Sequence, residues 1–256
     1  MIAARALRNR VAARRARRLG SLEAATRYVA TSRTSGEVQL ELLKREGCVP
    51  TSSVLEVGCG CLNAGVPVME YLDRGRYVGI EPNRWLLDAA LRDWRVRLLI
   101  ARKRPTFLER TDFDASALGR TFDYVLSHSV LSHCAHRQLE QFIANVARVL
   151  GPKGRILASL RLAEGNDYGS AGTPDGRDSM DEDWQYPGVS WFALATVRET
   201  AARHGLTVAV KPEYTGLYVA RRPHEIHDWL VLEGSVSRDA RSSSRAAAAP
   251  HRAAGR

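Results

Sequence analysis

A short apolar strand that runs directly into a glycine-rich turn constrains this chain more than any other feature. Residues 54–57 read Val-Leu-Glu-Val, and Gly58, Cys59 and Gly60 follow at once. A brief apolar run bounded by turn residues is typical of a buried strand. Glycine lets the backbone turn sharply and approach a ligand closely. The segment therefore predicts a strand end in an open α/β sheet, which is where such sheets bind their ligands.

The chain around this segment alternates between strand-like and helix-like stretches. Alternation of this kind is typical of a parallel sheet with crossover helices. We therefore expect an α/β fold with a doubly wound, mostly parallel seven-stranded sheet and helices on both faces. The predicted strands are 54–57, 77–80, 105–108, 122–126, 156–160, 206–210 and 229–232, and the predicted helices are 34–47, 63–72, 85–103 with breaks, 137–150 and 191–204, with a tight turn at 151–154.

A glutamate accompanies each of the first two strands. Glu56 lies two residues before Gly58, and Glu81 closes the second strand 21 residues after Gly60. A carboxylate at the end of the second strand can accept hydrogen bonds from both hydroxyls of a ribose. The glycine turn and this acid together predict a ligand that contains a nucleoside.

NAD and S-adenosylmethionine both contain a nucleoside, and two residues of this chain distinguish between them. A dinucleotide site of the form G-x-G-x-x-G would need a third glycine at position 63, where the chain has Asn63. Glu56 would repel a pyrophosphate, whereas it would attract a ligand that carries an ammonium and a sulfonium. S-adenosylmethionine carries both groups, so the residues favour it over NAD.

At four places the sequence resembles the motifs of class I S-adenosylmethionine-dependent methyltransferases. In chain order the motifs are residues 54–60 (VLEVGCG), 77–83 (YVGIEPN), 122–133 (FDYVLSHSVLSH) and 150–154 (LGPKG). The resemblance covers residues 35–235 and implies a Rossmann-like methyltransferase fold, S-adenosyl-L-methionine as the cofactor and methyl transfer as the activity. One departure is Leu62, which stands where the family often has a third glycine, and Gly65 is the candidate for part of that role.

The resemblance also assigns cofactor-binding roles residue by residue. It implies that Glu56, Gly58 and Gly60 line the methionine half and that Glu81 holds the ribose. The remaining expected contacts are Pro82 and Asn83 flanking the adenine, Asp112 near its amino group, Phe113 packed beside the ring, and Ser127, whose hydroxyl serves either a ligand or loop capping. Asp114 is the alternative to Asp112 near the amino group. The other interpretation of Asp112 is a turn or helix-capping role.

Two histidines follow the fourth predicted strand. Methyl transfer is an in-line displacement, so the protein mainly aligns the acceptor, the methyl carbon and the sulfur. Deprotonating an oxygen or nitrogen acceptor can require a base, for which histidine is the usual side chain. His128 and, after it, His133 are therefore the candidate catalytic residues. A structural role in positioning the loop is the alternative.

Basic charge is concentrated at the two ends of the chain. The formal net charge is +10, yet residues 1–18 hold seven arginines and no acid, and residues 238–256 hold five arginines and one aspartate. We expect a basic, partly helical or disordered extension over 1–34, the methyltransferase domain over 35–235, and a disordered basic tail over 236–256. Solvated tails are the simplest interpretation, and contact with nucleic acid or anionic lipid is the alternative.

Composition argues against several other classes of protein. The four cysteines lack the spacing of a zinc site, so we expect no metal and reduced thiols. No apolar run reaches the roughly 18 residues of a transmembrane helix. The first residues lack the apolar stretch of a secretory signal. The excess of arginine and alanine is typical of a GC-rich bacterial genome, and we expect a cytoplasmic enzyme.

A long polar segment at about 163–190 predicts a lid or a binding loop. Its acidic and aromatic side chains would suit a cationic acceptor, and a solvated acidic loop is the alternative. We therefore expect methyl transfer to an oxygen or nitrogen atom of a small-molecule acceptor. The alternatives are an RNA or protein methyltransferase recruited by the arginine-rich tails, and a protein that binds S-adenosylmethionine without catalysis.

Overall fold

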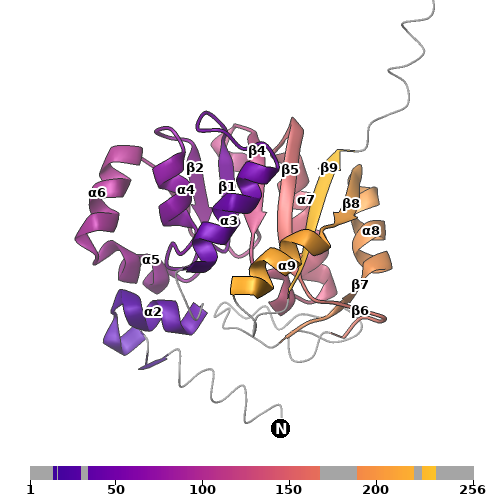
Figure 1. Ribbon diagram of the computed structural model, residues 1–256, viewed down its shortest axis with the longest axis horizontal. Helices are drawn as coiled ribbons and strands as arrows, with labels where there is room; N and C mark the ends of the chain where they lie inside the picture. The colour runs from indigo at the N-terminus through magenta and orange to yellow at the C-terminus, as the bar shows by residue number, and fades with distance from the viewer. Residues whose placement is uncertain (1–13, 16, 30–33, 168–188, 222–226, 235–256) are drawn as a thin grey trace, which may run out of the picture.

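The computed structural model of the chain describes residues 14–15, 17–29, 34–167, 189–221 and 227–234 (Figure 1). These residues form one seven-stranded sheet with helices on both faces, which confirms the expected fold class. Most of the expected lid segment and the extreme basic tails lie outside the described residues. Within the described part, no helix combines the length and the apolar character needed to cross a membrane.

The order of the strands in the sheet is β3-β2-β1-β4-β5-β9-β8. The first five pair in parallel, and β9 runs antiparallel to both of its neighbours. Strand order reverses between β1 and β4, so the two crossover directions leave a crevice at the carboxyl ends of these strands. The strands are β1 (Val54–Val57), β2 (Tyr77–Ile80), β3 (Thr106–Leu108), β4 (Phe122–Ser127), β5 (Leu150–Leu160), β8 (Leu206–Val210) and β9 (Asp228–Gly234).

The helices form two layers, one on each face of the sheet (Figure 1). One layer contains α2 (Leu22–Val29), α3 (Thr34–Arg45), α4 (Gly65–Tyr71), α5 (Arg84–Leu91), α6 (Trp94–Lys103) and α9 (Pro212–Arg221). The other contains α7 (His136–Arg148) and α8 (Leu194–Arg203). Two short 3-10 turns, η1 (Ser116–Leu118) and η2 (Leu131–His133), and a two-stranded sheet of β6 (Leu162–Ala163) and β7 (Phe192–Ala193) complete the fold.

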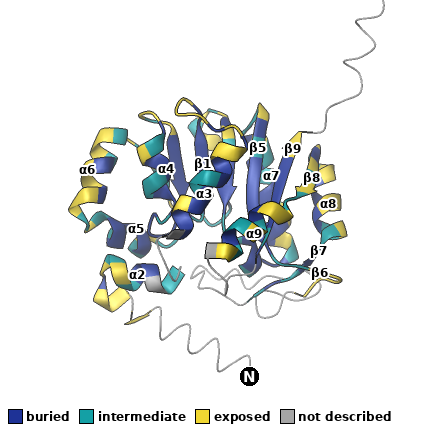
Figure 2. Ribbon diagram, viewed as in Figure 1, coloured by how far each residue is buried: buried dark blue, intermediate teal, exposed yellow. Residues whose placement is uncertain are grey.

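Side chains on the central strands alternate between the two apolar layers. On β1, Val54 packs in the layer of α3 and α4, whereas Leu55 and Val57 pack in the layer of α7. Tyr77 and Val78 divide in the same way on β2. Burial on both faces explains why these strands are nearly continuous in apolar residues (Figure 2). Glu56 is the one polar residue on β1, and burial of a carboxyl group on such a strand is costly unless it has a partner.

Three details differ from the sequence expectation. Residues 151–154 are not a separate turn but part of β5, where the pairing shifts between Phe122 and Tyr124 because β5 carries extra residues at that point. The helix expected from residue 191 begins only at Leu194, because Phe192–Ala193 pairs with β6 as a strand. Helix α9 was not predicted at all.

Helix α2 belongs to the folded core although it precedes the expected domain boundary at residue 35. Ala25 on this helix is fully buried, and the Thr26 hydroxyl lies 3.6 Å from the Cys61 thiol in the loop after β1. Tyr28 packs against Trp85 on α5, with ring centroids 5.3 Å apart. These contacts fix α2 beside the carboxyl ends of β1 and β2.

A buried glutamate joins three parts of the fold at the end of α3. The Glu46 carboxylate accepts hydrogen bonds from the Tyr214 hydroxyl at 2.5 Å and from Arg155 Nη1 at 2.7 Å, and it lies 3.4 Å from Lys211 Nζ. The Glu46 carbonyl oxygen accepts a bond from the Tyr124 hydroxyl at 2.9 Å. Glu46 is only 8% exposed, so these partners must offset the free-energy cost of burying its carboxylate. The cluster ties α3 to β4, β5 and α9.

Replacing Glu46 by alanine should therefore lower the free energy of unfolding by about 3 kcal/mol, because two cations and a hydroxyl lose a buried acceptor. Urea denaturation followed by circular dichroism measures this change. Glu41→Ala on the same helix is the matched control, since Glu41 forms only an exposed pair with Arg45 and its loss should cost less than about 1 kcal/mol. Equal losses for the two variants would contradict the prediction.

Candidate functional site

A cavity opens at the carboxyl ends of β1, β2 and β4. Its empty volume is about 880 Å³, a figure that includes the open solvent at its mouth. Residues from α2, α3, the loop after β1, the end of β2, the loop after β3 and the loop after β4 form its wall. The lining residues are Val29, Ser35, Gln39, Glu56, Val57, Gly58, Cys59, Gly60, Cys61, Asn63, Ala64, Ile80, Glu81, Pro82, Asn83, Leu86, Arg110, Phe113, His128, Ser129, Val130 and His133.

The loop after β1 requires glycine at its first turn. Gly58 has a φ of +76°, and a Cβ atom built on it would lie 2.3 Å from Val130 Cγ2. The Gly58 and Cys59 amides both donate to the Ile80 carbonyl, at 2.9 and 3.0 Å. These bonds hold the loop against the end of β2 and leave its backbone facing the cavity.

Leu62 adopts the left-handed conformation that a glycine would adopt freely. Its φ is +66° and its side chain is buried. Gly65 does not replace that glycine but makes room for a side chain. A Cβ atom at position 65 would lie 2.7 Å from the Tyr77 hydroxyl oxygen. The departure from the family pattern therefore stores some backbone strain in the loop.

Glu81 is buried at the end of β2 and is held by three donors. Its Oε2 atom accepts a bond from the Gly60 amide at 2.9 Å, and its Oε1 atom accepts bonds from the Asn83 amide at 2.8 Å and from Asn83 Nδ2 at 3.1 Å. Burial raises the pKa of Glu81 above its usual value, and the three donors oppose that rise. A carboxylate fixed in this way still has acceptor sites for ligand hydroxyls.

Glu56 is also buried, and it has a different type of partner. The Tyr77 hydroxyl donates to Glu56 Oε2 at 2.6 Å from the neighbouring strand. Burial raises the pKa of Glu56 to about 8, although the bond from Tyr77 favours the charged form. Among the described residues, neither Glu56 nor Glu81 forms an ion pair with a lysine or an arginine.

Two buried carboxyl groups beside one cavity are costly unless a ligand supplies positive charge. S-adenosylmethionine brings an ammonium and a sulfonium, and it also brings a ribose diol for an acceptor such as Glu81. The residues present therefore fit that cofactor on their own chemistry. They would not fit the pyrophosphate of a dinucleotide, which would add negative charge beside Glu56.

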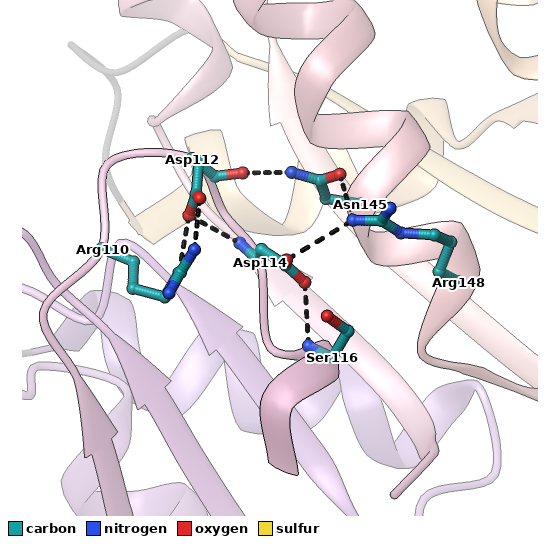
Figure 3. Close-up of polar contacts among 6 residues, drawn as sticks. All are labelled: Arg110, Asp112, Asp114, Ser116, Asn145 and Arg148. Atoms are coloured by element: carbon teal, nitrogen blue, oxygen red, sulfur yellow. Dashed lines mark hydrogen bonds and ion pairs between the residues drawn. The ribbon is translucent and has the colours of Figure 1, made fainter. Parts of the chain in front are cut away.

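The loop after β3 is fastened by a polar network (Figure 3). The Asp112 carboxylate accepts a bond from Arg110 Nε at 2.8 Å, and the Asp112 carbonyl oxygen accepts one from Asn145 Nδ2 on α7 at 2.5 Å. Asp114 accepts a bond from the Ser116 amide at 2.8 Å and lies 3.5 Å from Arg148 Nη2. The bond from Arg110 holds the pKa of Asp112 below its usual value.

Because Asp112 pairs with Arg110, it is absent from the cavity wall, whereas Arg110 and Phe113 form part of it. Phe113 adopts a φ of +60° and packs edge-on against Phe142, with ring centroids 5.7 Å apart. A contact between Asp112 and an adenine amino group stays a prediction. Asp114 does not line the cavity either.

Both candidate histidines lie on the cavity wall beyond β4. The His128 ring stacks on Trp229 of β9, with centroids 5.4 Å apart and an interplanar angle of 16°. Tyr218 of α9 packs against the same ring at 4.7 Å, and His227 packs against it at 5.4 Å. Aromatic neighbours on several sides therefore define the position of His128, whereas His133 lies on the short turn η2.

Ser127 and Ser129 differ in their surroundings. Ser127 is fully buried at the end of β4 and does not line the cavity, and its hydroxyl has no hydrogen-bond partner among the described residues. Ser129 lines the cavity, and its amide donates to the Ser159 hydroxyl at 2.9 Å. Of the two hydroxyls, that of Ser129 is therefore the one placed for contact with a ligand.

The structure gathers nine of the eleven predicted site residues on one cavity wall, and Asp112 and Ser127 are the two that it leaves out. Sequence reasoning missed several further lining residues. Arg110 follows the third strand and could have been found from that position alone. Val29, Ser35 and Gln39 lie on helices that precede the first strand, and only tertiary packing brings them to the site.

The fold is that of class I methyltransferases. The strand order with one antiparallel strand beside the edge, the glycine loop after β1 and the acid at the end of β2 are the features of that class. In agreement, residues 55–156 match the protein family described as a methyltransferase domain. The fold and this match both point to S-adenosylmethionine as the cofactor.

Several solved structures share the fold at low sequence identity. The glycopeptide N-methyltransferase MtfA with S-adenosylmethionine is 18% identical, with a TM-score of 0.54 over 78% of this chain and 93% of that chain. Magnesium protoporphyrin IX methyltransferase from Synechocystis PCC 6803 is 16% identical, with a TM-score of 0.53 over 79% and 83%. DesVI from Streptomyces venezuelae is 16% identical, with a TM-score of 0.53 over 81% and 94%.

The raised pKa of Glu56 predicts that cofactor binding depends on pH. Below pH 8 the carboxyl is protonated in the free protein, and pairing with a ligand ammonium requires it to ionise, so affinity should rise with pH. Between about pH 5.5 and 7 the ligand ammonium stays protonated, and the dissociation constant of S-adenosylmethionine should fall by up to about tenfold per pH unit. Calorimetry in buffers of different ionisation enthalpy should detect the released proton.

The Glu56→Gln variant is the control for this prediction. It keeps an acceptor for the Tyr77 hydroxyl but cannot ionise, so it should bind more weakly and show no slope between these pH values. The same slope in the variant and the wild type would assign the titration to another group.

Proposed function

We propose that this chain transfers a methyl group from S-adenosylmethionine to an oxygen or nitrogen atom of a small-molecule acceptor. The observation that carries the proposal is the pair of buried, strand-end glutamates on a cavity that also contains His128 and His133. The two glutamates suit a cationic amino acid group and a ribose. The two histidines lie on the part of the wall that follows β4, where we place the acceptor. The bound cofactor would supply an activated methyl group on its sulfonium.

Each residue of the wall has a role that follows from its contacts. Glu81 accepts the ribose hydroxyls while Gly60 and Asn83 hold its carboxylate in place. Glu56 faces the ammonium, with Tyr77 fixing one of its oxygens. The backbone of the glycine loop borders the methionine half.

His128 is the proposed base for the acceptor. One imidazole nitrogen would accept the proton of an acceptor hydroxyl as the oxygen bonds to the methyl carbon, or would first deprotonate an acceptor ammonium so that its nitrogen gains a lone pair. In either case the bond from the methyl carbon to the cofactor sulfur would break and leave a neutral thioether. The stacked Trp229 ring and the nearby Tyr218 ring hold the imidazole, and their electron-rich faces would favour the imidazolium that results. His133 is the second candidate for the same step.

Polar side chains on the cavity wall would suit a small polar acceptor. Ser35 and Gln39 on α3, Asn63 after β1 and Ser129 after β4 offer polar groups on its wall. The similar structures include enzymes named for a porphyrin and for a glycopeptide, so the fold accepts organic molecules of very different shape. The acidic segment over 168–188, expected to favour a cationic acceptor, lies outside the described residues.

The glutamate at the end of β2 provides the direct test of cofactor binding. Glu81→Gln should weaken S-adenosylmethionine binding at least about tenfold, since losing a charged hydrogen-bond partner costs about 1.5–3 kcal/mol. Calorimetry gives the dissociation constant, and thermal unfolding checks that the Gly60 turn survives. The exposed Glu109 gives the control variant Glu109→Gln, which should bind normally. Unchanged affinity in Glu81→Gln would remove this residue from the site.

Substitution of His128 provides the test of catalysis. His128→Gln should lower kcat about 100-fold and remove the acidic limb of the pH–rate profile, while cofactor affinity stays unchanged. His133→Gln should have a smaller effect. An unaltered kcat in His128→Gln together with a large loss in His133→Gln would exchange the two roles, and no loss in either would exclude a histidine base.

An untargeted screen with isotope-labelled S-adenosylmethionine and a metabolite extract would identify the acceptor. Labelled small molecules would support the proposal, whereas label in RNA or protein would replace it with the macromolecular alternative. Deleting residues 1–18 and 236–256 separates these outcomes again, because small-molecule turnover should survive the deletion. Cofactor binding without label transfer to any fraction would indicate a protein that binds the cofactor without catalysis.

A further inference from the structure

Large apolar side chains are exposed on the outer side of α6. Trp94 is 61% exposed and Leu98, one helical turn later, is 63% exposed. Val96 and Leu99 face the core, so the exposed pair is not needed to dock the helix. Helix α6 lies at the β3 edge of the sheet, away from β8 and α8 (Figure 1).

A second segment adds to this surface from the N-terminal side. Leu19 is 62% exposed, and residues 19–22 form an open hollow together with residues 92–95. Arg92 Nη1 donates to the Gly20 carbonyl, which joins the two segments. Leu19, Trp94 and Leu98 are the large apolar side chains of one surface, which we call the α6 surface.

Exposed arginines surround these apolar side chains. Residues 14–22 contain four arginines and no acid, and residues 92–104 contain six basic residues and only Asp93 as an acid. The Asp93 side chain is used as a helix cap, accepting a bond from the Arg95 amide at 2.8 Å. The exposed arginines of these two segments are Arg14, Arg15, Arg17, Arg18, Arg92, Arg95, Arg97, Arg102 and Arg104.

We propose that the α6 surface binds an anionic phospholipid membrane. Tryptophan and leucine at the centre would enter the headgroup and acyl boundary, and the arginines around them would pair with lipid phosphates. The Arg95 guanidinium already lies over the Trp94 ring, 5.4 Å from its centroid, so the aromatic and basic groups form one unit. This inference does not depend on the proposed reaction, because none of these side chains lines the catalytic cavity.

The apolar side chains favour a membrane over a nucleic acid. Arginines and one tryptophan would suit either partner, since bases stack on aromatic rings and phosphates pair with guanidinium groups. Leu19 and Leu98 have no ring on which a base can stack, yet both are more than half exposed. Burial of two leucines and a tryptophan gains free energy at a lipid boundary and little along a sugar-phosphate backbone.

Co-sedimentation of the full chain with vesicles tests the proposal. The chain should bind vesicles of phosphatidylcholine mixed with phosphatidylglycerol, should release at high salt, and should not bind phosphatidylcholine alone. Trp94→Ala with Leu98→Ala should weaken binding at least about tenfold through lost apolar burial.

Arg95→Glu with Arg97→Glu should weaken vesicle binding at least about tenfold through lost charge pairing. A blue shift of tryptophan fluorescence on vesicle addition should disappear in Trp94→Phe.

A control variant separates this surface from the general basicity of the chain. Lys153→Glu with Arg198→Glu changes the net charge equally at exposed positions on β5 and α8, and it should keep most of the binding. Equal weakening in the two charge-reversal variants would overturn the proposal, as would failure of the wild type to bind anionic vesicles. Tighter, Trp94-dependent binding to a single-stranded oligonucleotide would replace the lipid by a nucleic acid. Circular dichroism confirms that each variant is folded.

Discussion

The site depends on one hydrogen bond between two neighbouring strand ends. The Gly60 amide after β1 donates to the Glu81 carboxylate after β2 at 2.9 Å. This bond fixes the glycine loop, whose backbone would otherwise be free to adopt many conformations, and it orients the carboxylate at the same time. Asn83 completes the arrangement by donating twice to the other oxygen. Loop, acid and the start of α5 are therefore one rigid unit.

Glu56, the second glutamate of the cavity, is positioned by two neighbouring residues, Tyr77 and Gly65. Gly65 on α4 leaves space for the Tyr77 hydroxyl, which no larger residue would allow without displacement. Tyr77 then donates to Glu56 and fixes it beside the loop. The strained Leu62 packs against the same glycine, so the departure from the family's third glycine and the presence of Gly65 belong together. The glycine at position 65 of α4 thus sets the position of the Glu56 carboxyl group on β1.

The sequence predicted the parts of the fold and site that are encoded locally. Strand β1, its glycine turn and the acid ending β2 are contiguous in the chain, so pattern and charge were sufficient to place them. Asp112 was expected in the cavity because position after a strand does not reveal that Arg110 pairs with it. Val29 and Gln39 carry no local signal at all, since they reach the cavity only through packing of α2 and α3. Helix α9 was missed because it contains a central glycine, which disfavours helices, whereas the proline at its first position is compatible with a helix start but does not by itself predict one.

Helix α9, which the sequence did not predict, contacts both the Glu46 cluster and His128, the proposed catalytic base. Tyr218 on α9 packs against His128, and Trp229 on the following strand stacks on the same ring. Helix α9 is anchored at its first turn by Tyr214, whose hydroxyl donates to Glu46 at the end of α3. Helix α3 in turn brings Ser35 and Gln39 to the cavity. The buried carboxylate of Glu46 therefore joins the end of α3, which lines the cavity through Ser35 and Gln39, to the start of α9, the helix whose Tyr218 packs against His128.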